Sequence, residues 1–501
     1  MKKLVIVLSC AALFLSSFLI QSSTTAAKAP RKATILYFND AHEIIPVVND
    51  YGDRGGVARL KTVIDRVIEY NIHNAVTFGG DLGGGTLFGG VYKGFPIVEA
   101  FNQIGIDIAN FGQHDFDFGS EVTEELVKAS KFQWITSNLT DTEGDAFAKL
   151  PNYQIINQRG IKIGIIGLTD AMHTTTNDGK VIQQDIIPSA KKAVERIKNK
   201  QKVDVIIALT QESLEKDKQL LDAVPEIDAV FTEEKAEDRS FIIEHGNDYI
   251  LAPEGNIGSV IRLDITKHAK DINLIPTVIE VDHTVPEDPE LKSFADYYQN
   301  KLEEDLGQTI AQLDTPLVYG ENHESRYRET NIGNFVADSY RDHFNADIGL
   351  MNGGGIRTSI PAGEFTLRDA YSILPFGNKV ILANVKGETI QAAFENSVSR
   401  NLGGGFLQVS GINYSYNPSL PVGERVQSIT INNEPIDLEK DYLVAMPNYI
   451  FNGGDGYTMF AESEILVDDT NAQTDAEVLI QYASKLGTIN ASLEERIQVI
   501  E

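Results

Sequence analysis

Short runs of β-branched and other apolar residues alternate with helical patterns through the first half of the chain. Four such runs cover residues 34–38, 74–78, 161–167 and 203–209. Continuous apolar runs of this length are typical of strands that are buried on both faces and joined by helices. The pattern predicts a layered α/β domain over residues 30–285. In such a sheet, polar residues just after the strand ends meet in one crevice, where ligands bind.

A Lys- and Glu-rich segment separates this region from the rest of the chain. It follows Pro286 and Pro289, and residues 290–306 have helical spacing without a strand signal. The spacing predicts an interdomain helical linker within 286–314, although an ordinary surface helix of either domain would give the same pattern. A smaller second α/β domain is expected over 315–501.

Both length and glycine usage support two domains. A chain of 501 residues is too long for one hydrophobic core. The second half also holds glycine clusters at 353–355, 403–405 and 453–454. Glycine is favoured where a backbone turns sharply or approaches a ligand closely, so these clusters mark candidate binding segments.

The first thirty residues predict the cellular compartment. Two lysines precede an apolar run at 4–20, and small residues follow at 22–29. This order is typical of a secretory signal peptide, placed at 1–27, whereas an uncleaved anchor would need a longer apolar run. We therefore expect a protein secreted to the extracellular or cell-envelope space. Cys10, the single cysteine, would leave with the signal, so no disulfide is expected.

The charge of the chain limits its partners. The formal net charge is −29, which repels nucleic acid and anionic membranes. No later segment has the roughly 18 uncharged apolar residues of a membrane span. An anionic small substrate would have to be attracted by metal ions or by clustered arginines. We expect no nucleic-acid partner and no membrane span, and the sequence leaves the oligomeric state open.

Three polar motifs follow predicted strands in the first domain. Asn39-Asp40-Ala41-His42 follows the first strand, Gly80-Asp81 follows the second, and Gln113-His114-Asp115-Phe116-Asp117 lies just beyond an apolar run at 107–111. A carboxylate and an imidazole two residues apart on a loop can reach one ion. An aspartate at a strand end can bridge two cations. The motifs together predict a metal-binding region.

In this order, the motifs resemble those of the metallophosphoesterases, which run D-x-H, G-D, G-N-H-[DE], a histidine after a strand, and G-H-x-H. The resemblance implies a two-metal site that activates water for attack on a phosphate ester. In the 5′-nucleotidase branch, the histidine and second acid of G-N-H-E-F-D stabilise the transition state. This implies catalytic roles for His114 and Asp117. His114 would face the phosphoryl group as an imidazolium, and Asp117 would orient the His114 ring and keep it charged.

The chain departs from this pattern at four of the seven expected ligand positions, which hold Gln113, Gln211, Glu234 and Ala236. Oxygen donors of this kind suit Mg²⁺, Mn²⁺ or Ca²⁺ better than Zn²⁺, and the choice among these four ions stays open. One divalent ion is expected, and the second site should be weakened. The candidate metal ligands are Asp40, His42, Asp81, Gln113, Gln211 and Glu234.

The second domain resembles the nucleotide-binding domain of 5′-nucleotidases over nearly its whole length. Five ordered stretches carry the resemblance, at 326–334, 351–357, 374–378, 406–411 and 448–457.

The resemblance assigns a role to each candidate binding residue. It implies that Phe376 and Tyr449, where many relatives have a second Phe, stack on the two faces of a base. Asp455 would accept hydrogen bonds from ribose hydroxyls. The phosphate oxygens would be held by Arg326, Asn352 and Arg357. Phe406 and Phe451 are assigned to the core.

Both resemblances imply a phosphohydrolase of the 5′-nucleotidase type, in which the second domain presents a nucleotide or nucleoside to ions held by the first. The signal-peptide pattern adds that the enzyme is exported. Two alternatives stay open. One is a catalytically impaired member of the family that acts as a nucleotide-binding protein. The other is an adhesion protein that uses the fold as a scaffold, which the intact binding residues disfavour.

Overall fold

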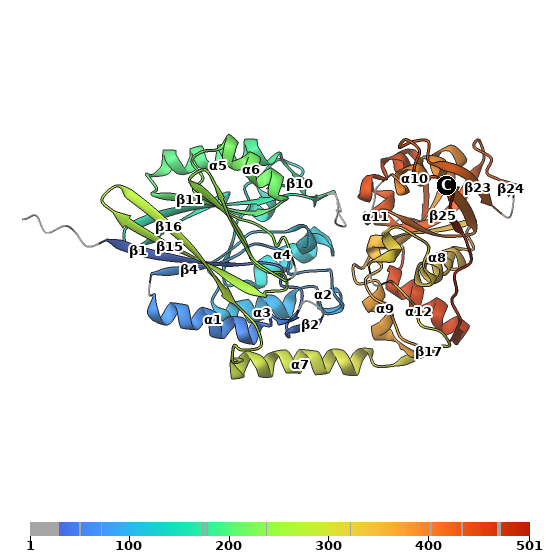
Figure 1. Cartoon of the computed structure of the whole chain (residues 1–501), viewed down its shortest axis with the longest axis horizontal. Coiled ribbons are helices and arrows are strands. Elements are labelled where there is room, and N and C mark those ends of the chain that lie inside the picture. The colour runs from blue at the N-terminus through green and yellow to red at the C-terminus, as the bar shows by residue number, and fades with distance from the viewer. Residues whose placement is uncertain are drawn as a thin grey trace, which may run out of the picture.

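The structure is a computed structural model of the whole chain, and it is shown in Figure 1. The predicted signal peptide at 1–27 lies outside the residues that the structure describes. The described residues are 30–49, 52–71, 73–172, 175, 179–236, 238–320, 322–399, 403–431, 434–467 and 472–500.

The first lobe contains two six-stranded sheets that pack face to face. The first has the order β16-β15-β1-β4-β5-β6, in which β1, β4, β5 and β6 are parallel. Its strands are β1 (Arg31–Phe38), β4 (Asn74–Phe78), β5 (Ile108–Ala109), β6 (Gln133–Trp134), β15 (Ser259–His268) and β16 (Asp271–Glu280). The strands predicted at 34–38 and 74–78 are both present.

The second sheet has the order β13-β14-β12-β11-β9-β8. Its strands are β8 (Tyr153–Gln158), β9 (Ile161–Thr169), β11 (Val205–Gln211), β12 (Ala229–Phe231), β13 (Phe241–His245) and β14 (Asp248–Ala252). Ile35 and Tyr37 of the first sheet pack with Ile163 and Ile207 of the second in one buried cluster. The apolar runs that predicted strands therefore fill the space between the sheets.

Helices cover the outer face of each sheet, which completes a layered sandwich (Figure 1). Buried residues of α1 and α3 pack on the first sheet, and those of α5 and α6 pack on the second. The helices of this lobe are α1 (Val57–Tyr70), α2 (Leu87–Tyr92), α3 (Phe95–Ile104), α4 (Ser120–Ala129), α5 (Ile186–Lys200) and α6 (Leu214–Ala223). A hairpin of β2 (Val47–Asn49) and β3 (Gly52–Arg54) and a strand pair of β7 (Leu139–Thr140) and β10 (Ile182–Gln183) lie outside the two sheets.

A single helix, α7 (Pro289–Leu306), leads from the first lobe to the second (Figure 1). Asp288 caps its first turn by accepting hydrogen bonds from the main-chain N–H groups of Glu290 and Leu291. Proline stands at the first helical position, where its missing N–H costs nothing. The helix falls inside the segment for which a linker is predicted, while the domain boundaries themselves stay predictions.

The second lobe is smaller and is built on a five-stranded sheet of order β21-β18-β25-β20-β26. Sheets of order β19-β17-β27 and β24-β23-β22-β28 flank it. The strands are β17 (Thr309–Leu313), β18 (Ile348–Asn352), β19 (Gly363–Thr366), β20 (Val380–Lys386), β21 (Leu407–Ser410), β22 (Ile412–Tyr416), β23 (Val426–Ile431), β24 (Glu434–Pro435), β25 (Asp441–Pro447), β26 (Glu464–Val467), β27 (Thr488–Ile489) and β28 (Ile497–Val499). The predicted α/β fold class is thereby confirmed.

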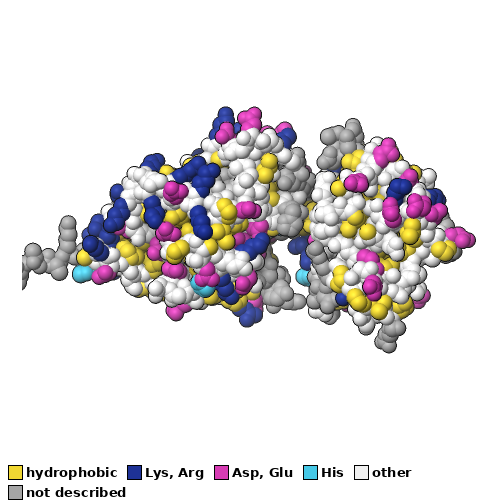
Figure 2. Space-filling model, turned by 90° about the horizontal axis from the view of Figure 1, so that it is seen from above, with side chains coloured by type: hydrophobic (Ala, Val, Ile, Leu, Met, Phe, Trp, Pro, Cys, Tyr) yellow, Lys and Arg dark blue, Asp and Glu magenta, His cyan; other side chains and the backbone are white. Residues whose placement is uncertain are grey.

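The α-helices described in this lobe are α8 (Asn331–Phe344), α9 (Leu367–Ile373), α10 (Gly387–Ser397), α11 (Asn448–Phe451) and α12 (Asp475–Leu486). Phe406 and Phe451 are 3% and 8% exposed and lie in its core, as expected. The two lobes face each other across a narrow junction (Figure 2). In the described part of the chain, no helix is long and apolar enough to cross a membrane.

Candidate active site

The polar motifs of the first lobe lie together at the carboxyl ends of β1, β4 and β5. The main-chain N–H of Asp40 donates to the Gly80 carbonyl at 3.1 Å, and that of Ala41 donates to the Asp81 carbonyl at 2.8 Å. Asp40 and Asp81 have φ values of 55° and 66°, in the left-handed region that aspartate tolerates better than most residues. Such conformations concentrate at functional sites because the surrounding structure must hold them.

Asp115 fastens two of these loops to each other. Its buried carboxylate accepts hydrogen bonds from the main-chain N–H groups of Asp81 at 3.1 Å, Leu82 at 2.9 Å and Gly112 at 2.8 Å. Burial raises the pKa of Asp115, while these three N–H groups act in the opposite direction. Asp115 therefore stabilises the conformation of the loops after β4 and β5.

Three of the candidate metal ligands, Asp40, His42 and Glu234, lie in one region. His42 Nε2 lies 2.7 Å from Asp40 Oδ1, and Asp40 Oδ2 accepts a hydrogen bond from the main-chain N–H of Asn256 at 2.8 Å. Although burial opposes it, His42 lowers the pKa of Asp40. Glu234 reaches the same region, since its Oε2 accepts a hydrogen bond from the Asn39 amide at 3.1 Å.

The candidate donors have the chemistry of a site for a hard divalent cation. Polar atoms that are buried without a hydrogen-bond partner include His42 Nδ1, Gln113 Oε1 and both amide atoms of Gln211. Burial raises the pKa of Asp81 to about 7, and burial followed by repulsion from Asp40 raises the pKa of Glu234 well above its usual range. Clustered buried carboxylates of this kind call for a positive charge.

The present arrangement is not that of a formed coordination shell. Among the described residues, no group of three or more His, Cys, Asp or Glu side chains is placed to hold a metal ion. By its chemistry the candidate set offers one imidazole and otherwise oxygen donors, which fits a hard divalent cation. It does not reproduce a histidine-rich site for two ions.

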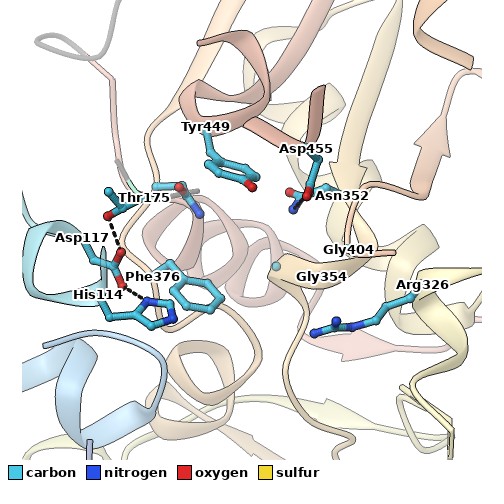
Figure 3. Close-up of a pocket in the computed structure, with 12 residues that line it drawn as sticks. His114, Asp117, Thr175, Arg326, Asn352, Gly354, Phe376, Gly404, Tyr449 and Asp455 are labelled. Carbon is cyan, nitrogen blue, oxygen red and sulfur yellow. Dashed lines mark hydrogen bonds and ion pairs between the residues drawn. The ribbon is translucent and has the colours of Figure 1, made fainter. Parts of the chain in front are cut away.

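His114 and Asp117 form a hydrogen-bonded pair at the edge of this region. His114 Nδ1 lies 2.8 Å from Asp117 Oδ2, and Asp117 Oδ1 accepts a hydrogen bond from the Thr175 hydroxyl at 2.6 Å (Figure 3). Burial alone would lower the pKa of His114, but the Asp117 carboxylate raises it to about 9. The imidazole is therefore protonated at neutral pH.

No motif in the sequence indicated a functional role for Thr175. It lies in the connection between β9 and β10, and its partner Asp117 is 58 residues away in the chain. Thr175 is buried beside the His114–Asp117 pair. Its hydroxyl donates a hydrogen bond to one carboxylate oxygen of Asp117, while His114 is hydrogen-bonded to the other. Only the fold brings this third member to the pair.

One cavity of about 120 Å³ joins residues of both lobes. It brings together both predicted catalytic residues and five of the six predicted substrate-binding residues. The first lobe contributes His114, Asp117 and Thr175, and the second contributes Arg326, Asn352, Gly354, Gly355, Phe376, Asn378, Gly404, Tyr449 and Asp455 (Figure 3). The six candidate metal ligands are not in this lining.

Phe376 connects the two halves of the cavity. Its ring lies 5.8 Å from the His114 ring, centroid to centroid, with an angle of 16° between their planes. The guanidinium of Arg357 lies 5.3 Å from the centre of the Phe376 ring. Arg357, the sixth predicted binding residue, is exposed and does not line the cavity, so the structure places it at the rim.

Glycines make close packing possible around the cavity. A Cβ on Gly84 would lie 1.9 Å from Asp117 Oδ2, and one on Gly354 would lie 2.7 Å from Gly404 Cα. No side chain larger than hydrogen fits at either place without a shift. Two of the glycine-rich segments therefore pack against each other at the wall of the cavity, which agrees with their expected place beside a ligand.

Comparison with known proteins points to one family. A family model of the 5′-nucleotidase C-terminal domain matches residues 309–462. The chain is 28% identical to the trifunctional nucleotide phosphoesterase protein YfkN of Bacillus subtilis over 93% of its own length, but it spans only 35% of that longer protein. It is also 28% identical to the 5′-nucleotidase of Bos taurus, a match that covers 94% of this chain and 92% of the other.

A solved structure extends the agreement to three dimensions. The 5′-nucleotidase precursor from Thermus thermophilus matches with a TM-score of 0.76 and 28% identity, covering 94% of this chain and 99% of that one. The domain match, the relatives and this structure agree with the motifs in both lobes. The chain belongs to the 5′-nucleotidase family.

Proposed function

We propose that this protein is an exported, divalent-metal-dependent phosphohydrolase that releases phosphate from nucleotides. Its relatives are 5′-nucleotidases and phosphoesterases, which supports a hydrolase. The observation that carries the proposal is the shared cavity, where the His114–Asp117 pair of one lobe faces the aromatic and polar residues of the other. Export rests on the signal-peptide pattern at 1–27.

The cavity gives each side chain a role toward a nucleotide. Phe376 and Tyr449 offer rings for base stacking, and Asp455 offers a carboxylate to the ribose. Arg326 lines the same wall and offers its guanidinium to phosphate oxygens. The nucleoside would be held by the second lobe, with its phosphate directed at the first.

His114 would act on the phosphoryl group through Nε2. Its Nδ1 is engaged by Asp117 at 2.8 Å, so Nε2 is the ring nitrogen left to donate a hydrogen bond. Because the imidazole is positively charged at neutral pH, it would stabilise negative charge that develops on the phosphoryl oxygens. Asp117, itself held by Thr175, fixes the orientation of the ring.

The residues that would hold a divalent ion are Asp40, His42, Asp81, Gln113, Gln211 and Glu234. A divalent ion bound there would supply Lewis-acid stabilisation of the transferring phosphoryl group and activate water. The oxygen-rich donor set favours Mg²⁺, Mn²⁺ or Ca²⁺ over Zn²⁺.

The deciding experiment is phosphate release from a panel of nucleoside mono-, di- and triphosphates. Each nucleotide is incubated with Mg²⁺, Mn²⁺, Ca²⁺, Zn²⁺ or a chelator, and nucleotide binding is measured in parallel by calorimetry. We expect release that requires a divalent ion and stops with chelator. Binding without release under every condition would identify a nucleotide-binding protein that has lost catalysis. A protein that neither binds any nucleotide nor releases phosphate would refute the proposal.

The altered ligands also predict the metal content of the protein. Elemental analysis after purification without chelator should find at most about one tightly bound transition metal per chain, because oxygen donors replace the expected histidines. Two tightly bound zinc ions would show that the ligand assignment is wrong.

Changing Thr175→Val should lower the turnover number about tenfold while changing KM little, because the Asp117 carboxylate loses one of two fixed partners and no longer holds His114 in place. Thr175→Ser keeps the hydroxyl and should restore most of the rate. Steady-state phosphate release from AMP by the three proteins gives the measurement. Equal rates for the valine and serine variants would remove Thr175 from the mechanism.

A further inference from the structure

A second and larger cavity lies at the junction of the two lobes. Helix α2 of the first lobe packs against α9 of the second there (Figure 1), and a Cβ on Gly90 would lie 2.5 Å from the Pro375 carbonyl oxygen. This junction cavity measures about 700 Å³, against about 120 Å³ for the shared cavity. Small-molecule sites occupy a range of about 300 to 1,000 Å³. Of the residues described in its lining, the proposed function uses Asp117 alone.

Apolar side chains from both lobes line the junction cavity. They are Leu87 and Val91 of α2, Phe118 in the connection before α4, Leu306 at the end of α7 and Tyr371 of α9. Tyr371 packs against the cores of both lobes. A ligand with a flat ring would remove this apolar and aromatic surface from water.

Three lysines line the same cavity, although the formal net charge of the chain is −29. Lys93 lies at the C-terminal end of α2, where its ammonium is 5.6 Å from the centre of the Phe118 ring. Lys180 is 2.8 Å from the carboxylate of Glu121, so its charge is paired with an acid. Lys379 directly precedes β20 of the second lobe. Lys93 and Lys379 therefore bring positive charge to the apolar surface from opposite lobes.

The two acids in the described lining are both engaged by other groups. Asp117 is hydrogen-bonded to His114 and Thr175. Glu477 lies in the first turn of α12, where its Oε2 accepts a hydrogen bond from the main-chain N–H of Thr474 at 2.9 Å. Positive charge beside an apolar surface attracts an organic anion. The lining therefore fits a ligand with a flat apolar body and one acidic group.

A common wall separates the junction cavity from the shared cavity. Asp117 lines both of them. Phe376 lines the shared cavity, while the next residue, Gly377, lines the junction cavity. In the same way, Tyr449 lines the shared cavity and Asn448 lines the junction cavity. A ligand in the junction cavity would therefore contact the segments that carry both candidate stacking rings.

Asn448 ties these two segments together. It is 2% exposed, and its Oδ1 accepts hydrogen bonds from the main-chain N–H groups of Lys379 and Tyr449, each at 3.0 Å. Its own main-chain N–H donates to the Lys379 carbonyl at 2.8 Å. Lys379 lies on the same segment as Phe376. Hydrogen bonds thus connect Lys379 of the junction cavity to both residues that are proposed to stack on the base.

We propose that the junction cavity is an effector site for an aromatic organic anion. The ring of the anion packs on Phe118 and Tyr371. Its acidic group pairs with the ammonium groups of Lys93 and Lys379. The site goes beyond the proposed function because its ligand is not the substrate, and only its coupling to catalysis rests on that function.

The direction of the coupling follows from the position of the cavity. A ligand that contacts both lobes stabilises the arrangement in which His114 faces the ring of Phe376. It should therefore strengthen nucleotide binding, and by linkage a bound nucleotide should strengthen binding of the anion to the same extent.

The test is calorimetry with naphthalene-2-carboxylate in the presence of saturating adenosine. Adenosine fills the shared cavity, so any binding of the carboxylate that remains belongs to another site. We expect a single molecule of the carboxylate to bind per chain under this condition. Naphthalene-2-methanol has the same ring without the charge and should bind about tenfold more weakly, the value of one hydrogen bond to a charged group.

A double variant, Lys93→Gln with Lys379→Gln, should weaken the carboxylate about tenfold or more and leave the neutral alcohol within about twofold. Adenosine affinity and phosphate release from AMP alone should not change, since neither lysine lines the shared cavity. The matched control is Lys128→Gln with Lys485→Gln, which removes one lysine from each lobe outside both cavities. It should bind every ligand as the parent does, and thermal unfolding reports whether each variant remains folded.

Steady-state kinetics with AMP measures the coupling. Saturating naphthalene-2-carboxylate should lower the KM for AMP about fivefold or more in the parent and in the control, and should leave it unchanged in the double variant. Binding of the carboxylate without any change in KM would overturn the effector role.

Displacement of the carboxylate by adenosine would overturn the inference, because the anion would then lie in the shared cavity. Equal binding by the parent and the Lys93 and Lys379 double variant would also overturn it, as would no binding at about 1 mM. A parent that binds the carboxylate through these lysines but binds no nucleotide and releases no phosphate would refute the proposed function, while the anion site would stand.

Discussion

Replacing His114 by asparagine should lower the turnover number for AMP by roughly two orders of magnitude or more, with nucleotide affinity nearly unchanged. Asparagine can donate a hydrogen bond, but it cannot carry the positive charge that Asp117 maintains on the imidazole at neutral pH. The loss should therefore fall on the transition state, where phosphoryl charge develops. Steady-state phosphate release gives the rate, and calorimetry with AMP gives the affinity.

His245→Asn is the matched control for this variant. His245 lies on β13, where its Nε2 is 2.8 Å from the carboxylate of Asp222, and it does not line the cavity. The control thus removes an imidazole that is paired with an acid elsewhere on the protein. It should retain the full rate. A turnover number that is unchanged in the His114 variant would place the chemistry on other residues.

Replacing Tyr449 by alanine should cost about 1 to 3 kcal/mol of nucleoside affinity, the contribution of one stacking face. Arg326→Ala serves as the complementary change, because its guanidinium lines the cavity and is proposed to hold the phosphate. It should weaken AMP and leave adenosine nearly unaffected. Calorimetry with adenosine, AMP and inorganic phosphate separates these effects, and adenosine and AMP should both bind better than phosphate.

A Tyr449→Ala variant that binds adenosine as well as the parent would contradict the assignment of the second lobe. So would a parent protein that binds no member of a broad nucleoside and nucleotide panel at high micromolar concentration. In either case the functional proposal would lose its support, since the shared cavity would then hold some other ligand.

The sequence predicted those features that depend on local patterns. Continuous apolar runs form the strands of the two sheets. These runs have no polar face to expose to water, so their strands are buried on both faces. The motifs of the first domain lie at the carboxyl ends of β1, β4 and β5, where parallel strands bring polar loops together. His114, Phe376 and Tyr449 meet in one cavity, although they are distant in the chain.

Features that depend on contacts between distant segments could not be predicted in this way. Thr175 contacts Asp117 from the connection that follows β9 of the second sheet, and no spacing in the sequence links the two residues. Arg357 belongs to a recognised motif, yet it lies at the rim and contacts Phe376. The amide of Asn352 donates to Asp455, a residue about a hundred positions further along the chain, and no sequence pattern links the two. In each case the orientation of a side chain is set by neighbours that only the folded chain supplies.

The three main-chain hydrogen bonds to Asp115 bear on how this family can diverge. They hold the loops after β4 and β5 through a protein carboxylate, so that the shape of these loops does not depend on a bound ion. Substitutions at the candidate ion-binding positions would then leave the fold of this lobe intact. On the proposed function, the ion that this end of the sheet prefers could therefore change without loss of the architecture around it.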